Sequence, residues 1–214
     1  MARVVVIDYG MGNLRSVAKA LEKVSRDTVL VTSDAKAIRA ADRLVFPGVG
    51  AIRDCMQELH RLELTEVIRE ESVRKPFLGI CLGMQALMDF SEENQHTDCL
   101  SIFKGSVKKF QFSPESNQAN LKIPHMGWNQ VRQQFAHPCW KDIEDDSRFY
   151  FVHSYYVESQ DRALVAGVTE YGKPFDAALA QDFIFAVQFH PEKSQTAGLQ
   201  LLENFCNWDG HWAR

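Results

Sequence analysis

Short apolar runs and stretches of helical periodicity alternate along the first half of the chain. The apolar runs predict buried strands over residues 4–7, 28–32, 43–46 and 77–80. Apolar positions spaced three and four residues apart predict helices over residues 14–24, 52–59 and 82–90, and Asn13 stands at the N-cap position of the first helix. Because strands separated by helices pair in parallel and are covered on both faces, this half predicts a mainly parallel open sheet flanked by helices.

The second half of the chain has shorter apolar runs with hairpin-like spacing. They predict strands over residues 107–110, 129–132, 149–152, 164–168 and 184–189, followed by a closing helix over residues 199–208. The polar stretch over residues 113–120 is expected to be a loop. The sequence therefore predicts an α/β fold with a mixed sheet and antiparallel additions in the C-terminal half, all in one domain over residues 1–214.

Composition and charge narrow the class of protein. Hydrophobic residues make up 45% and charged residues 24%, which is typical of a globular protein with an ample core. The net charge is −4 with scattered Lys and Arg, so we expect no nucleic-acid partner, and no apolar run is long enough for a membrane helix. The first strand has no charged leader before it, and the five cysteines form no CxxC pair. We therefore expect neither a disulfide framework nor a zinc site, and a cytoplasmic location is the simplest expectation.

The segment Gly79–Gly83 has the pattern of a nucleophile elbow, with Cys81 at its centre. It lies between a predicted strand and a predicted helix, where a sharp turn presents the central side chain at the carboxyl end of the sheet. Small residues on either side allow the backbone to approach closely, and the start of the helix favours the nucleophilic thiolate. The remaining cysteines are expected to be buried and structural, and they are Cys55, Cys99, Cys139 and Cys206.

Two further segments supply what such a nucleophile needs. His190 and Glu192 lie two residues apart on a segment expected to be extended, so both side chains can face the elbow, the carboxylate fixing the imidazole. The glycine-rich turn Pro47–Gly50 also follows a strand, and its free backbone N–H groups can bind an oxyanion together with the N–H of Leu82. Taken alone, either segment would be a common structural feature. Together with the nucleophile elbow, they indicate a catalytic site.

These motifs resemble those of a known family. Residues 47–50 (PGVG), 79–85 (GICLGMQ) and 188–192 (QFHPE) resemble the signature of class I glutamine amidotransferases, whose fold is flavodoxin-like. Residues 8–14 (DYGMGNL), 124–129 (PHMGWN) and 151–156 (FVHSYY) narrow the resemblance to the glutaminase subunits of imidazole glycerol phosphate synthases. The resemblance covers essentially the whole chain.

The resemblance implies a mechanism. Cys81 would attack the side-chain amide carbon of glutamine, His190 would transfer protons and Glu192 would orient the imidazole, without a metal or an organic cofactor. The oxyanion donors that it implies are the backbone N–H groups of Leu82 and of Val49 or Gly50. The residues that it places at the bound glutamine are Gly50, Gln85, His153, Ser154 and Tyr155.

It also implies a partner. In this family the released ammonia passes through a tunnel to a (β/α)₈-barrel cyclase subunit, with which the glutaminase forms a heterodimer in histidine biosynthesis. Met126, Trp128 and Tyr150 are expected interface residues because Met and aromatic side chains are enriched at such surfaces. Asn13 and Lys193 are placed near the interface by the resemblance.

Other interpretations stay open. The chain could be the glutaminase of another class I amidotransferase, although PHMGWN argues against this. It could be a cysteine peptidase, although the residues around Cys81 match neither the papain nor the caspase signature. Finally, it could be a scaffold that only caps the ammonia tunnel of a partner, although an intact set of Cys81, His190 and Glu192 argues against this.

Overall fold

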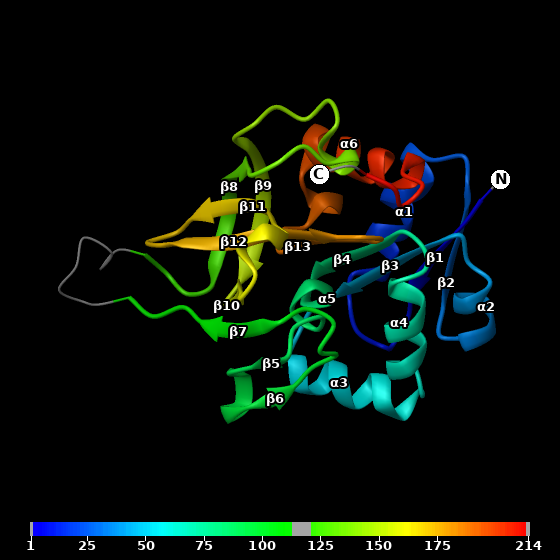
Figure 1. The fold of residues 1–214 in the computed structure, drawn as a ribbon, viewed down its shortest axis with the longest axis horizontal. Coiled ribbons are helices and arrows are strands. Elements are labelled where there is room, and N and C mark those ends of the chain that lie inside the picture. The colour runs from blue at the N-terminus through cyan, green and yellow to red at the C-terminus, as the bar shows by residue number, and fades with distance from the viewer. Residues whose placement is uncertain (1, 113–120, 213–214) are drawn as a thin grey trace.

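A long mixed sheet with helices on both faces organises the molecule (Figure 1). The computed structural model describes residues 2–112 and 121–212, and the loop expected over residues 113–120 lies outside them. The main path of the sheet has the order β2-β1-β3-β4-β13-β12-β10-β7-β5-β6. The mutually parallel strands are β1 (Arg3–Ile7), β2 (Thr28–Thr32), β3 (Arg43–Gly48), β4 (Phe77–Cys81) and β13 (Ile184–Val187). The prediction of a mainly parallel sheet in the first half is therefore confirmed.

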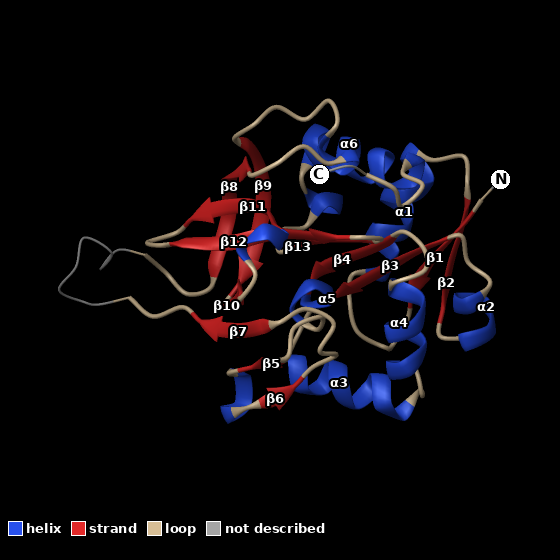
Figure 2. Cartoon of the chain, viewed as in Figure 1, coloured by secondary structure: helices blue, strands red, loops and turns tan. Residues whose placement is uncertain are grey.

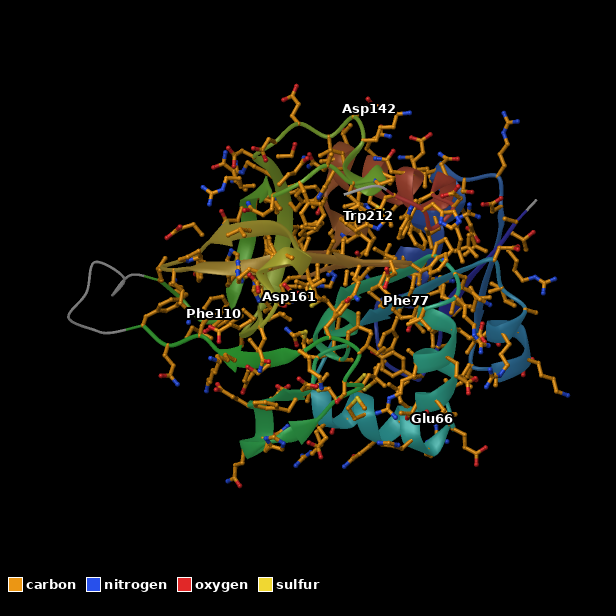
Figure 3. All side chains as sticks on the ribbon, in the orientation of Figure 1. Glu66, Phe77, Phe110, Asp142, Asp161 and Trp212 are labelled. Atoms are coloured by element: carbon orange, nitrogen blue, oxygen red, sulfur yellow. The ribbon has the colours of Figure 1, made fainter. Side chains whose placement is uncertain are left out.

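Two helical layers cover the parallel strands, as their alternating side chains require. Val4 and Val6 pack with residues of α1 (Leu14–Val24) and α6 (Gln195–Asn207) on one face. Val5 and Ile7 pack on the other face, where α3 (Ile52–Arg61) and α4 (Thr65–Ser72) lie (Figure 2). Successive strand residues point to opposite faces, so strands buried on both faces are apolar at every position. Figure 3 shows Phe77 between the sheet and α4, and Glu66 on the outer side of α4.

The C-terminal half extends the sheet with antiparallel strands, as predicted. They and the short strands beside them are β5 (Phe90–Ser91), β6 (Thr97–Asp98), β7 (Gly105–Lys109), β8 (His125–Gln133), β9 (Ser147–His153), β10 (Tyr155–Ser159), β11 (Val165–Glu170) and β12 (Pro174–Gln181). The hairpin β8–β9 joins the sheet through β11 and forms a second layer beside it. Short 3₁₀ turns occur at η1 (Glu93–Gln95), η2 (Pro138–Trp140), η3 (Arg162–Leu164) and η4 (Pro191–Lys193).

Some predicted elements differ from the structure. The helix expected over residues 82–90 ends at Gln85 as α5 (Leu82–Gln85), because Phe90 instead begins a strand that pairs with β7. The last strand, β13, is not only an antiparallel addition, since it lies parallel to β4. Asn13 stands at the N-cap of α1, but its side chain makes no capping hydrogen bond. The pattern also missed α2 (Ala35–Arg39), α4, β10 and β12.

No helix within residues 2–112 and 121–212 is long and apolar enough to cross a membrane.

Candidate active site

Cys81 ends β4 in a strained conformation that exposes its side chain to a pocket. Its φ is 54° and ψ is −106°, a region that costs a non-glycine residue about 1–3 kcal/mol and is retained mainly at functional sites. A Cβ added at Gly83 would come within 1.8 Å of the Phe46 carbonyl oxygen, and one at Gly79 within 3.2 Å of the Ala186 Cβ. The turn therefore requires glycine at 83 and a very small residue at 79, which is the steric pattern of a nucleophile elbow.

The remaining cysteines have the structural role expected of them. Cys55, Cys99, Cys139 and Cys206 are free thiols, and all are buried. Burial raises the pKa of the Cys55 thiol to about 12 and that of Cys206 to about 11, which keeps both protonated.

The structure brings His190 and Glu192 together behind Cys81. His190 Nδ1 lies 2.9 Å from Glu192 Oε1, and the two side chains are only 2% and 1% exposed. Burial lowers the pKa of His190, but the charge of Cys81, hydrogen bonding to it, and Glu192 outweigh burial and raise this pKa to about 10. The imidazole therefore holds a proton, and its buried Nε2, with no other partner among the described residues, is available to the Cys81 thiol.

The local backbone at this pair differs from the prediction. Pro191–Lys193 forms the 3₁₀ turn η4, so His190 and Glu192 do not share one face of an extended segment. The turn bends the carboxylate back onto the imidazole instead. Ser194 fixes the turn, since its hydroxyl donates to the His190 carbonyl oxygen at 2.6 Å and accepts from the Tyr150 amide at 2.9 Å.

The turn that follows β3 lies beside the nucleophile, because Gly48 is paired with Cys81 in the parallel ladder. A Cβ at Gly48 would lie 2.1 Å from the Tyr9 hydroxyl and 2.9 Å from the Leu82 Cβ, so only glycine allows this close approach. Gly50 has a φ of 103°. Among the described residues, the backbone N–H groups of Val49 and Gly50 have no hydrogen-bond acceptor, which leaves them available to an anion.

A pocket of about 460 Å³ opens over Cys81. Its lining consists of Val49, Gly50, Cys81, Leu82, Gln85, Glu93, Pro124, Val152, His153, Ser154, Tyr155 and Lys193. The lining includes every residue that the sequence placed at the oxyanion or at the substrate. His190 and Glu192 are buried beneath this surface rather than exposed in it.

Two polar residues of the site were not singled out from the sequence. Glu93 lines the pocket, and its Oε2 accepts a hydrogen bond from the Ile52 amide at 2.9 Å, which ties η1 to the segment after Gly50. Gln188 is completely buried, and its Nε2 lies 3.6 Å from the Cys81 sulfur. No local pattern distinguishes Glu93 from its polar neighbours, whereas Gln188 lies in the QFHPE motif and could have been considered there.

His153, in the wall of the pocket, belongs to a hydrogen-bonded pair of neutral histidines. Its Nδ1 must donate to the Tyr155 carbonyl oxygen at 2.7 Å, so its Nε2 accepts from His125 Nδ1 at 2.9 Å. His125 Nε2 then accepts from Asn129 Nδ2 at 3.3 Å. Burial lowers the pKa of His153 to about 3 and that of His125 to about 4. The Phe110 ring packs edge-on against both rings, with centroids 6.5 Å from that of His125 and 5.3 Å from that of His153.

Four of the five expected interface residues form one exposed patch beside the pocket. Met126 and Trp128 are 62% and 37% exposed. Trp128 packs edge-on against Tyr150 at 6.1 Å between ring centroids, and Lys193 Nζ lies 5.9 Å from the centre of the Tyr150 ring. The fifth residue, Asn13, precedes α1, which packs against η4.

No cluster of three or more potential metal ligands occurs within residues 2–112 and 121–212.

The chain is similar to known glutamine amidotransferases over nearly its whole length. The family model "Glutamine amidotransferase class-I" matches residues 5–208. The imidazole glycerol phosphate synthase subunit HisH of Pseudomonas syringae pv. syringae (strain B728a) is 60% identical over 212 residues, which cover 99% of this chain and all of the relative. The corresponding subunit of Nitrosococcus oceani is 58% identical over 98% of this chain and 99% of its own length.

The fold is also found among solved structures. The structure of PurLQS from Thermotoga maritima superposes with a TM-score of 0.71 at 17% identity, covering 97% of this chain and 99% of the other. At this identity the likeness concerns the fold alone.

Proposed function

This chain belongs to the class I glutamine amidotransferase family, and from that premise we propose that it is the glutaminase subunit of an imidazole glycerol phosphate synthase. It hydrolyses glutamine to glutamate and ammonia for histidine biosynthesis. The observation that carries the proposal is Cys81 in a strained elbow at the floor of a pocket, with the buried pair of His190 and Glu192 behind it. We treat residues 1–214 as one amidotransferase unit, since the family match extends over residues 5–208.

The proposed reaction begins with the proton already on the imidazole. Cys81 and Glu192 raise the pKa of His190 to about 10 against the effect of burial, so the imidazole holds the proton. Cys81 attacks the amide carbon of glutamine as the nucleophile. His190 then gives its proton to the departing ammonia and takes one from the water that hydrolyses the thioester. Glu192 keeps Nδ1 protonated, so that Nε2 is the atom that exchanges protons.

The oxyanion is stabilised by backbone N–H groups next to the nucleophile. Leu82 is the first residue of α5, and Val49 and Gly50 provide amides without a protein acceptor among the described residues. One donor of this kind is typically worth about 3 kcal/mol of barrier.

The pocket has the polar groups that free glutamine requires. The carboxylate of Glu93 can pair with the α-ammonium group, and Lys193 at the rim can pair with the α-carboxylate. Gly50, Gln85 and the segment His153–Tyr155 supply the remaining wall. A glutamine held by both charged groups on its α-carbon presents its side-chain amide to Cys81.

We propose that the exposed patch formed by Met126, Trp128, Tyr150 and Lys193 binds the (β/α)₈-barrel cyclase subunit. Two of its side chains are large exposed hydrophobics, and the patch adjoins the pocket through Lys193. Docking there would cover the pocket mouth and deliver ammonia to the partner before water protonates it. Asn13 would lie at the edge of this interface. The proposal includes a cytoplasmic location, for which the five unpaired buried thiols are support.

The test is the release of glutamate from glutamine, measured for the chain alone and for its mixture with the cyclase and the cyclase's nucleotide ligand. We expect release to rise in the mixture and to disappear in Cys81→Ala. Release that no cyclase increases would assign the chain to another synthase. Release that persists in Cys81→Ala, or that is absent from both mixtures, would contradict the triad mechanism.

A further inference from the structure

Gln188 lies directly beside the nucleophile, just after β13, the strand next to the elbow. β13 runs parallel to β4 with Val187 opposite Ile80, so the next residues, Gln188 and Cys81, are neighbours. The Gln188 side chain is completely buried and its Nε2 lies 3.6 Å from the Cys81 sulfur. A glutamine buried without access to solvent is costly unless its amide is satisfied, so this position is informative.

The neighbours of Gln188 determine which end of its amide faces the sulfur. The Tyr155 carbonyl oxygen can only accept, so the Gln85 atom 3.1 Å from it is the NH₂ group. The same Gln85 Nε2 lies 3.0 Å from one of the two terminal amide atoms of Gln188. Because Gln85 donates in this contact, that Gln188 atom must be the oxygen, Oε1. The NH₂ group of Gln188 is consequently directed at Cys81. This assignment depends only on one backbone carbonyl and on the fixed polarity of two amides.

We propose that Gln188 is a positioning residue that donates an N–H to the Cys81 thiolate and is held in that orientation by Gln85 and the Tyr155 carbonyl. The inference rests on the proposed function for its role in glutamine hydrolysis. A hydrogen bond to a charged acceptor is stronger than one to a neutral group, so the donor favours the thiolate. It also holds the sulfur at the floor of the pocket while His190 exchanges its proton.

The chain of hydrogen bonds from Cys81 through Gln188 and Gln85 to the Tyr155 carbonyl ends in the wall of the pocket. Tyr155 lines the pocket, whereas Gln188 does not. Gln188→Glu keeps the acceptor for Gln85 and should therefore affect the sulfur alone, whereas Gln188→Met leaves the Gln85 amide held by the Tyr155 carbonyl only.

The experiment compares Gln188→Met and Gln188→Glu with the unchanged chain. Methionine keeps the length of the side chain but cannot donate, and glutamate keeps the acceptor for Gln85 while placing a carboxylate against the sulfur. The first readout is the rate of Cys81 alkylation by iodoacetamide as a function of pH, followed by mass spectrometry of the Cys81 peptide. The second is kcat and KM for glutamine in the complex with the cyclase.

We expect the alkylation profile to move to higher pH in both variants, further in Gln188→Glu. Loss of one charge-assisted donor should lower kcat about ten-fold to a hundred-fold, with little change in KM. Thr169→Val is the matched control. Thr169 is buried on β11 and its hydroxyl has no partner among the described residues, so this variant removes a buried polar group and should leave the profile unchanged.

Alkylation profiles that stay unchanged in both variants would overturn the proposal, whatever happens to kcat and KM. The alkylation assay needs no glutamine. A Gln188-dependent profile without glutamate release would therefore refute the proposed function and keep this inference. Normal glutamine turnover in Gln188→Met would do the reverse.

Discussion

At the scale of single residues, the charge of one imidazole decides whether the site can work. Burial acts to lower the pKa of His190, and the Cys81 thiolate and Glu192 reverse this effect and raise the pKa to about 10. The imidazole of His190 therefore stays protonated through neutral pH.

We predict that Glu192→Gln lowers kcat/KM by about a hundred-fold, because the amide keeps the shape of the side chain but removes a charge that stabilises the imidazolium. The pKa of His190 should fall, so the alkaline limit of activity should move to lower pH. The measurement is kcat/KM for glutamine across pH. A profile with the original alkaline limit would show that Glu192 does not act on the charge of His190.

The neutral histidine pair gives a second prediction, on stability in acid. Burial lowers the pKa of His125 to about 4 and that of His153 to about 3, and it also lowers the pKa of His137 to about 3. Each folded pKa lies below the unfolded value near 6.5, so protons bind more tightly to the unfolded chain. The contribution to stability is present above about pH 6.5 and is lost as pH falls toward the folded values.

We predict that His125→Asn reduces the slope of the free energy of unfolding between about pH 6.5 and pH 5, since one of three buried histidines with a lowered pKa is removed. The variant should also be less stable at neutral pH, because the stacking of His125 on Phe151 and Tyr171 is lost. Urea unfolding at a series of pH values measures both. His96→Asn changes an exposed ring and serves as the control. An equal change of slope in the two variants would contradict the prediction.

At the scale of elements, the elbow depends on how closely β4, α5 and β3 approach one another. The contact between Gly83 and the Phe46 backbone leaves no room for a methyl group. A Cβ at Gly79 would lie 3.2 Å from the Ala186 Cβ and from the Gly83 backbone, a distance that small shifts of these neighbours can relieve.

We therefore predict that Gly83→Ala destabilises the fold by more than the 1–3 kcal/mol that is usual for overpacking, about 3 kcal/mol or more, and abolishes Cys81 alkylation. Gly79→Ala should cost less and keep a reactive thiol. Urea unfolding and iodoacetamide labelling of both variants test this order. If both variants were equally stable, the elbow would not depend on the approach of α5 to β3.

Some elements could not be predicted from the pattern of apolar residues. β12 includes the run Ala177–Ala180, and alanine has a low strand propensity, yet the run is fully buried in the sheet between neighbouring strands. α5 is short because Phe90 pairs with Ser106, a residue that local periodicity does not include. The strands of the first half were predictable because burial on both faces leaves a continuous apolar run.

At the scale of the whole molecule, the site combines residues that a local motif can identify with residues that only the fold brings together. Cys81 and His190 could be found because each follows a strand in a short, chemically distinctive segment. Glu93 could not, since its place in the lining of the pocket depends on the pairing of β5 with β7 and on a hydrogen bond to Ile52. The polarity of the Gln188 amide depends on Tyr155, far away in sequence.

The exposed patch around Met126 shows how the fold separates catalysis from association. β8 and β9 alternate, so His125 is buried in the polar pair behind the pocket while Met126, the next residue, faces outward. Met126 does not line the pocket. A change at Met126 can therefore affect binding of the cyclase without altering how the isolated chain binds glutamine.

We predict that Met126→Asp weakens the complex with the cyclase by about ten-fold to a hundred-fold, because a charge replaces an apolar side chain that would be desolvated at the centre of the interface. Basal glutamate release by the chain alone should be unchanged. Val73→Asp is the matched control, since Val73 is 54% exposed, follows α4 and receives the same charge. Titration of each variant with the cyclase, followed by glutamate release, measures both quantities. Tight binding by Met126→Asp together with weak binding by Val73→Asp would move the interface to the end of α4, whose Val73 is not among the residues that line the pocket over Cys81.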